Sequence, residues 1–255
     1  MNFWTRINTR WSAKDLDSWS SISKSLYVLF PVVIYFLAGE VVQIVLLTIV
    51  NNYFAASTAE SQMWAQNSSY TIWAMIYGLG IVVSLALIFK AAKSEIIFAF
   101  SGEEIEGGKK SLFLPLLGCS VISVAFAIGL NYLFFFIGAN ELSKTFGEVQ
   151  KAQYGVDFTV GVILFGILSP VVEEVMFRGM LYNRLKRMFS MYLAMGISSL
   201  LFGVFHGDIV QGVYGFLMGL LIVFCYERFK SFWIPVAMHI VANVCVFVLN
   251  YTVWK

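Results

Sequence analysis

The chain places a small set of ionisable and amide side chains inside long apolar stretches of sequence. The members of this set that could transfer protons or donate hydrogen bonds are Glu173, Glu174, Arg178, His206, His239 and Asn243. Both histidines of the chain belong to it. Because an ionisable group is energetically costly inside a bilayer, residues of these types at such positions are candidates for an acid–base or transport site.

The spacing of these residues predicts which side chains share a helix face. Glu174 and Arg178 are four residues apart and can form an ion pair, which lowers the cost of burying both charges. Glu173 lies about 100° around the same helix, so it can face a different helix. His239 and Asn243 are also four residues apart, so their side chains project together.

The segments that carry these residues have the composition of membrane spans. The chain has 255 residues, of which 59% are hydrophobic and 13% are charged, and its mean hydropathy is +0.79. A soluble domain is nearer one quarter charged, and a bilayer is crossed by about 20 apolar residues in a helix. We therefore expect an all-α, polytopic transmembrane helix bundle with about seven spans. The predicted spans are Leu26–Val50, Tyr70–Phe89, Leu112–Ile137, Val160–Leu185, Tyr192–His206, Val210–Tyr226 and Phe232–Val253.

Two further segments are expected at the membrane surface or partly inside it. Ile96–Phe100 is apolar but too short to cross, so we expect it at the interface or as an eighth, re-entrant element. Residues 1–24 are polar and carry Trp4, Trp11 and Trp19. This pattern favours an interfacial N-terminal segment over a signal peptide.

The depth of the polar residues predicts that they meet. Counted at 1.5 Å per residue from the basic end of each span, Glu173 lies about 16 Å deep and His206 about 24 Å deep. His239 and Asn243 lie about 14 and 20 Å deep on the same count. Pro170 lacks a backbone N–H one turn before Glu173, so we expect a kink there that opens a water-filled cavity.

Basic residues predict the orientation of the spans. With the N-terminus in the cytoplasm, thirteen Lys and Arg residues fall on the cytoplasmic side and three on the other, with Arg178 inside a span. This division follows the positive-inside rule. We expect a multi-pass protein of the cell membrane with its C-terminus outside. The net charge of +2 is small and dispersed, which argues against nucleic-acid binding.

Three motifs lie in order on successive predicted helices. They are Glu173-Glu174-x-x-x-Arg178, Phe202-x-x-x-His206 and His239-x-x-x-Asn243. Together they resemble the CPBP family, which contains CAAX prenyl endopeptidases and the Abi-type bacteriocin-processing or bacteriocin-immunity membrane proteins. The resemblance predicts a catalytic helix bundle at residues 112–255. Residues 25–111 would form two more membrane helices and a cytoplasmic loop, preceded by the segment 1–24.

The resemblance implies a glutamate-dependent intramembrane endopeptidase whose partners are the bilayer and a membrane-associated or lipidated peptide. Glu173 would be the general base that activates water, and His206 would hold that water and pass its proton to the leaving amine. His239 and Asn243 would donate hydrogen bonds to the oxyanion. The implied enzyme needs no cofactor. The residues expected to support these four are Glu174, Arg178 and Phe202.

Other functions remain open at this stage. Glu173, His206 and His239 could bind zinc in a metal-dependent membrane protease, although the HExxH motif is absent. The same cavity could bind a peptide without cleaving it, as in an immunity protein. An ion or proton transporter could use Glu40 together with Glu173 and the histidines. The sequence carries no signal for the oligomeric state.

Overall fold

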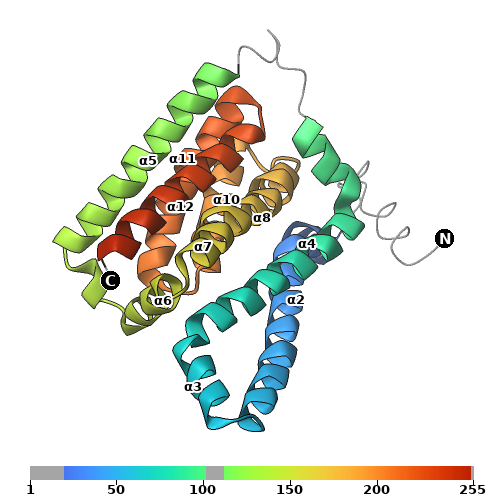
Figure 1. The fold of residues 1–255 in the computed structure, drawn as a ribbon. Helices are drawn as coiled ribbons and strands as arrows, with labels where there is room; N and C mark the ends of the chain where they lie inside the picture. The colour runs from blue at the N-terminus through green and yellow to red at the C-terminus, as the bar shows by residue number, and fades with distance from the viewer. Residues whose placement is uncertain (1–19, 102–111, 254–255) are drawn as a thin grey trace.

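The protein is a bundle of helices, described by a computed structural model for residues 20–101 and 112–253. All the secondary structure in this part of the chain is helical (Figure 1). The elements in chain order are α2 (Ser21–Ala55), α3 (Ala59–Asn67), α4 (Ser69–Ser101), α5 (Phe113–Phe136), η3 (Ala139–Glu141), α6 (Lys144–Tyr154), α7 (Phe158–Gly161), η4 (Val162–Leu168), α8 (Ser169–Glu174), η5 (Val175–Tyr182), α9 (Asn183–Leu185), α10 (Met191–Phe205), α11 (Ile209–Phe229) and α12 (Trp233–Val253).

The helices confirm a multi-pass membrane fold. Within the described residues, six helical segments are long and apolar enough to cross a membrane, and each coincides with a predicted span. These segments are Ser21–Ala55, Ser69–Ile97, Phe113–Phe136, Phe158–Leu185, Ile209–Phe229 and Trp233–Thr252. The remaining predicted span forms α10, which has 15 residues. Its length of about 22 Å is less than the thickness of the hydrocarbon core.

Some sequence predictions need correction or fall outside the described residues. Ile96–Phe100 is not a separate re-entrant element: it lies in the last turns of α4, beyond a break at Ala92. Most of the predicted interfacial segment, residues 1–19, lies outside the described residues. Its last residues belong to α2, which begins at Ser21. The short helices α3 and α6 were not predicted, because neither is apolar enough to stand out in hydropathy.

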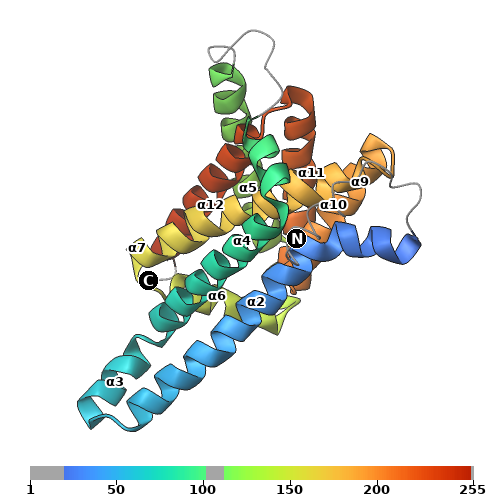
Figure 2. The same ribbon diagram turned by 90° about the vertical axis from the view of Figure 1, so that its right-hand side faces the viewer.

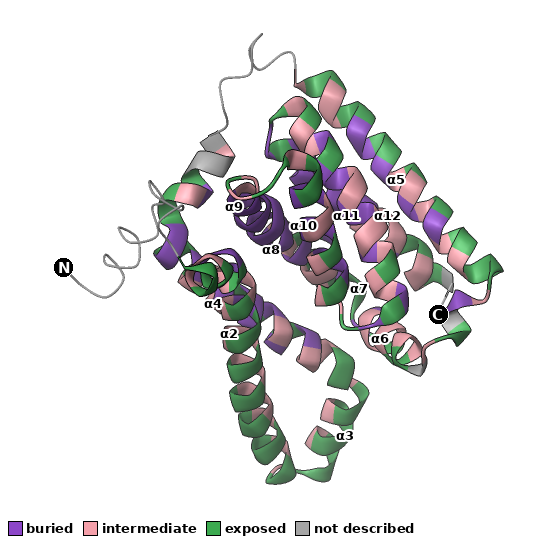
Figure 3. Cartoon of the chain, turned by 180° about the vertical axis from the view of Figure 1, so that it is seen from behind, coloured by how far each residue is buried: buried purple, intermediate pink, exposed green. Residues whose placement is uncertain are grey.

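The span Phe158–Leu185, which carries Glu173 and which we call the central span, is the most buried of the six spans. α10 packs on α11, α12 packs on α5, and α2 packs on α4. The α2–α4 pair diverges from the other helices toward α3, as two perpendicular views show (Figures 1 and 2). Figure 3 shows α8 and α9 as the most continuously buried part of the chain, whereas α2 is largely exposed. The span that carries Glu173 therefore lies in protein surroundings, and α2 presents an apolar surface suited to lipid.

This central span changes helix type on both sides of α8. The segments η4 and η5 are π-helical, so two wider stretches flank the six α-helical residues Ser169–Glu174. Segments of π-helix are frequent at functional sites, because they displace side chains from the regular α-helical positions. Pro170 is the second residue of α8, so its missing N–H falls just after the end of η4, where the hydrogen-bond pattern already changes. The kink expected at Pro170 stays a prediction.

Polar contacts tie several helix ends together at one end of the bundle. Arg184 of α9 forms an ion pair with Glu95 of α4 at 2.9 Å and also donates to the backbone carbonyl of Tyr27 in α2. Glu227 near the end of α11 accepts a hydrogen bond from Lys186 at 2.9 Å. These contacts place the start of α2 and the ends of α4, α9 and α11 at one level, where the predicted cytoplasmic basic residues gather.

Glycines allow the backbones of α10 and α11 to approach closely. A Cβ atom on Gly203 would collide with the carbonyl oxygen of Gly212 and would lie 3.2 Å from the backbone nitrogen of Phe216. A Cβ atom on Gly219 would lie 3.2 Å from the Phe202 ring. Small residues commonly occupy such interfaces in membranes, where close backbone packing drives helix association. The α10–α11 pair carries His206 at its turn, so this packing positions part of the candidate site.

We predict that Gly203→Ala destabilises the protein by about 1–3 kcal/mol, because backbone atoms cannot yield as a flexible side chain can. The thermal unfolding midpoint of the purified protein in lipid nanodiscs would fall. The matched control is Gly196→Ala on the same helix, where a Cβ atom would meet nothing within 4 Å. This control should leave the midpoint unchanged or raise it slightly, since alanine favours a helix more than glycine does. Equal midpoints for the two variants would contradict the packing argument.

Candidate active site

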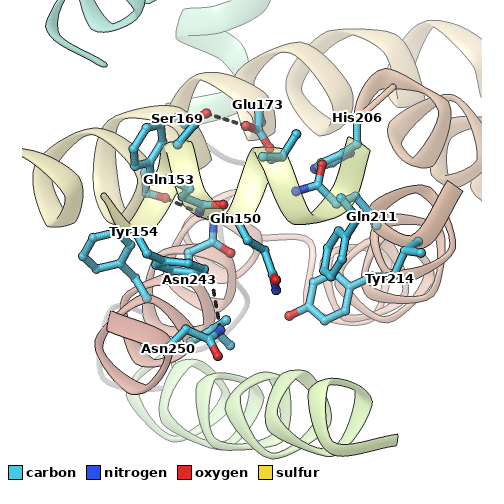
Figure 4. A pocket seen from close by; sticks show the side chains of 18 of the residues that line it. Gln150, Gln153, Tyr154, Ser169, Glu173, His206, Gln211, Tyr214, Asn243 and Asn250 are labelled. Carbon is cyan, nitrogen blue, oxygen red and sulfur yellow. Dashed lines mark hydrogen bonds between the residues drawn. The ribbon is translucent and has the colours of Figure 1, made fainter. Parts of the chain in front are cut away.

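A cavity of about 1080 Å³ lies between the helices and is lined by all four residues predicted to be catalytic. Glu173 comes from α8, His206 from the end of α10, and His239 and Asn243 from α12. Phe202 also lines it. Figure 4 shows the labelled polar side chains around this space. The four residues that the sequence placed at similar depths in the bilayer thus line one cavity. Their chemical roles stay predictions.

The two carboxylate oxygens of Glu173 have different surroundings. Oε1 accepts a hydrogen bond of 2.5 Å from the hydroxyl of Ser169, one turn earlier in α8. Oε2 lies 3.8 Å from Nε2 of His239, which is too long for a direct hydrogen bond. The side chain is 9% exposed and lines the cavity. One oxygen is therefore anchored, and the other can bind a proton or a water molecule.

The second glutamate, Glu174, is shared between two helices. Its Oε1 accepts a hydrogen bond from Nη1 of Arg178 at 2.7 Å, which is the predicted i,i+4 ion pair. The same oxygen lies 2.7 Å from Nδ1 of His239 on α12, a contact that the sequence did not predict. Arg178 also donates through Nη2 to the carbonyl of Gly219 at 3.1 Å. Glu174 and Arg178 are both fully buried, so these contacts compensate charges that water does not reach.

Phe202 is the packing centre of the site. Its ring lies edge-on to both imidazoles, with centroid distances of 5.0 Å to His206 and 5.7 Å to His239. The guanidinium of Arg178 lies 4.6 Å from the ring centroid, in range for a cation–π contact. Phe177 packs against another edge at 5.0 Å. Phe202 thus contacts both histidines and the arginine of the ion pair, while its auxiliary role stays a prediction.

His206 has a defined tautomer because of its contact with the backbone. Its Nδ1 lies 2.8 Å from the carbonyl oxygen of Phe202, an acceptor, so Nδ1 carries a proton. In the neutral ring, Nε2 is then the proton acceptor. Asp208 does not orient this ring: it caps α11 through the backbone N–H of Val210 and Gln211. His206 is consequently oriented by its own helix end.

Asn243 is tied to the π-helical part of the central span. Its Nδ2 donates to the carbonyl of Phe165 in η4 at 3.2 Å. An amide nitrogen has two hydrogens, so one N–H remains for another acceptor. Asn243 and His239 lie one turn apart on α12 and both line the cavity, as their spacing predicted.

Three hydroxyl residues of the site escaped the sequence analysis: Ser169, Tyr35 and Tyr77. The Tyr35 and Tyr77 hydroxyls are 3.1 Å apart, and both phenols lie close enough to interact with Ser169 and Glu173. Ser169 could have been found, because it precedes Glu173 by four residues. The tyrosines carry no local signal. Because Tyr35 lies in α2 and Tyr77 in α4, these two helices also line the cavity.

Among the described residues, no group of three or more His, Cys, Asp and Glu side chains is arranged to hold a metal ion. The imidazoles of His206 and His239 each have Nδ1 engaged, by a backbone carbonyl and by Glu174 respectively. The donors that face the cavity are suited to proton transfer and to hydrogen bonding with a peptide carbonyl.

Comparisons with known proteins found similarity to membrane peptidases. Residues 155–245 match the protein-family model for the Type II CAAX prenyl endopeptidase Rce1-like family, a segment that includes all four predicted catalytic residues. A protein of Bacillus subtilis (strain 168) named "Putative membrane peptidase YdiL" is 26% identical over 200 residues, which cover 76% of this chain and 75% of that protein. No solved structure matches the chain.

The matched segment contains the paired glutamates with the arginine, the first histidine and the histidine–asparagine pair, on helices that converge on one cavity inside a membrane bundle. These findings together support the resemblance to the CPBP family of membrane peptidases.

Proposed function

We propose that the protein is an intramembrane endopeptidase that hydrolyses a membrane-associated or lipidated peptide with water activated by Glu173. The observation that supports this most directly is the asymmetric environment of Glu173. Ser169 anchors Oε1, and Oε2 faces the cavity 3.8 Å from His239. A carboxylate held in this way can take a proton from a water molecule without turning away from it.

The proposed mechanism uses His239 as a hydrogen-bond donor to the oxyanion. Because Nδ1 donates to the Glu174 carboxylate, Nε2 can donate a hydrogen bond only when the ring is an imidazolium. If His239 is an imidazolium, its charge and that of Arg178 balance the charges of the two glutamates, Glu173 and Glu174. A net charge of zero suits a site of low dielectric constant. His239 Nε2–H and the second N–H of Asn243 would then bind the oxyanion that forms when water attacks the peptide carbonyl.

His206 completes the reaction in this proposal. Its neutral form presents the Nε2 lone pair, so it can hold the water that Glu173 deprotonates. The proton taken by Glu173 passes through His206 to the amine nitrogen as the carbon–nitrogen bond breaks. The products are a carboxylic acid and an amine, and the site returns to its starting protonation. No step in this proposal requires a metal or an organic cofactor.

The orientation of the protein is part of the same proposal. The basic residues gather at the end of the bundle where Arg184 meets Glu95, and we assign this end to the cytoplasm by the positive-inside rule. The N-terminus would then lie in the cytoplasm, and the C-terminus would lie outside the cell membrane.

We predict that Glu173→Gln lowers peptide cleavage by about 10²- to 10⁴-fold, because the amide is almost the same size but cannot act as a base. Comparative peptidomics of membranes with either protein would identify the substrate as the peptide that accumulates uncut only with the variant. Glu60→Gln is the control, since Glu60 is an exposed carboxylate of α3 outside the cavity. Full cleavage by folded Glu173→Gln protein would overturn the role of Glu173 as the base. If neither the unmodified protein nor the variant cleaved any peptide, a peptide-binding or immunity function would be favoured instead.

We predict that metal chelators leave cleavage of that peptide nearly unchanged. Purified protein would be incubated with EDTA or 1,10-phenanthroline and then assayed for cleavage. A glutamate base needs no metal, whereas a zinc enzyme would lose almost all activity and recover it when zinc is added back. Such loss and recovery would overturn the metal-free mechanism while leaving the peptidase assignment intact.

We predict that Ser169→Ala lowers kcat by about ten-fold and changes KM little, because it removes a hydrogen bond to a charged group that orients the base. Ser169→Thr should retain most of the activity, since it keeps the hydroxyl. Steady-state kinetics on the identified peptide would separate the two constants. A rise in KM at constant kcat would instead assign Ser169 to substrate binding.

A further inference from the structure

The part of the cavity beneath α6 differs in chemistry from the part that holds Glu173. It is lined by carboxamide side chains from three helices, which we call the amide patch (Figure 4). The patch consists of Gln150 and Gln153 of α6, Gln211 of α11 and Asn250 of α12. These residues belong to none of the three motifs, and the mechanism proposed above does not use them.

The amide patch has unused hydrogen-bonding capacity. Within the described part of the chain, the carboxamides of Gln150, Gln153 and Gln211 form no hydrogen bond, whereas Asn250 donates to the Tyr154 hydroxyl at 3.0 Å. A carboxamide has both a donor and an acceptor, as does each peptide unit of an extended chain. Half-buried amides on facing helices can therefore bind the backbone of a peptide that lies between them.

The charges around the amide patch restrict what can bind there. The charged residues lining the cavity include Glu40, Glu148 and Glu173, whereas no Lys or Arg of the described residues lines it. Burial raises the pKa of Tyr154 to about 12, so its hydroxyl stays neutral at physiological pH. An acidic segment in this space would meet the carboxylates of Glu40 and Glu148, while the imidazolium proposed for His239 already lies against Glu173 and Glu174. Like charges that face one another disfavour such binding.

The helix that covers the amide patch is held near both ends. Ser143 caps the start of α6 through the N–H of Phe146 and donates its hydroxyl hydrogen to Asp208 at the start of α11. Tyr154 at the other end bonds to Asn250 and packs against Phe247 of α12 at 5.6 Å. The patch is consequently a preformed surface.

We propose that the amide patch is a substrate subsite that binds an extended, uncharged or basic polar stretch of peptide and disfavours an acidic one. This inference rests on the proposed function, since Glu173 and the amide patch line the same cavity and one peptide could reach both. The polar flank of the substrate would lie beneath α6 while its scissile bond lies beside Glu173.

Binding to the Glu173→Gln protein in nanodiscs tests the subsite without cleavage. Three fluorescent peptides would share one apolar anchor and differ in a flank of Ser and Asn, of Ser and Lys, or of Ser and Asp. We expect the neutral and basic flanks to bind with similar affinity, and the acidic flank to bind about ten-fold more weakly by fluorescence anisotropy. Equal binding of all three peptides would overturn the proposal.

A charge-reversal variant shows whether the amide patch is responsible. Gln150→Lys together with Gln211→Lys, in the Glu173→Gln protein, should reverse the order so that the acidic flank binds most tightly. Misfolding would weaken all three peptides and could not produce a reversal. Gln66→Lys is the matched control, because Gln66 is an exposed amide of α3 outside the cavity and should keep the original order. An unchanged order in the folded double variant would assign the preference to another surface and overturn the subsite.

The two proposals can fail separately. Cleavage by the unmodified protein with no preference among the flanks would overturn the subsite and leave the peptidase in place. A flank preference that reverses with the lysine pair, without cleavage of any peptide, would support the subsite and contradict the enzymatic function.

Discussion

The structure depends on one buried carboxylate that accepts hydrogen bonds from two helices. Glu174 binds Arg178 on its own span and His239 on α12, both at 2.7 Å. Removing either partner would leave an uncompensated charge where water does not reach, and such a change strongly lowers the stability of a folded protein. Arg178 extends the network to the backbone of α11 through Gly219 and to α10 through the Phe202 ring. The contacts that balance the buried charges are thus the same contacts that hold the central span against α10, α11 and α12.

The local part of this arrangement could be predicted from the sequence. Helix periodicity gave the Glu174–Arg178 pair and the shared face of His239 and Asn243, and span length gave their common depth. The partner choice of His239 could not be predicted, because it depends on which helices become neighbours and on how each is rotated. Tyr35 and Tyr77 could not be predicted for the same reason: they line the cavity from α2 and α4, and within their own spans they look like ordinary aromatic residues.

Hydropathy and capping proved informative about different elements. Hydropathy predicted the long spans but missed α3 and α6, whose faces are mixed. Their starts are nevertheless marked in the sequence by Thr58 and Ser143, each of which accepts a hydrogen bond from a backbone N–H three residues later. The π-helical stretches beside α8 had no comparable signal beyond Pro170.

The short α10 gives the molecule uneven thickness. This helix extends about 22 Å, whereas the bilayer core is about 30 Å thick. It exposes Leu193, Leu200 and Val204, so it offers lipid a shorter apolar wall than its neighbours do. Acyl chains beside it must compress or tilt to match that wall, which draws headgroups inward on this flank. We therefore expect lipid chain length to affect the turn that carries His206.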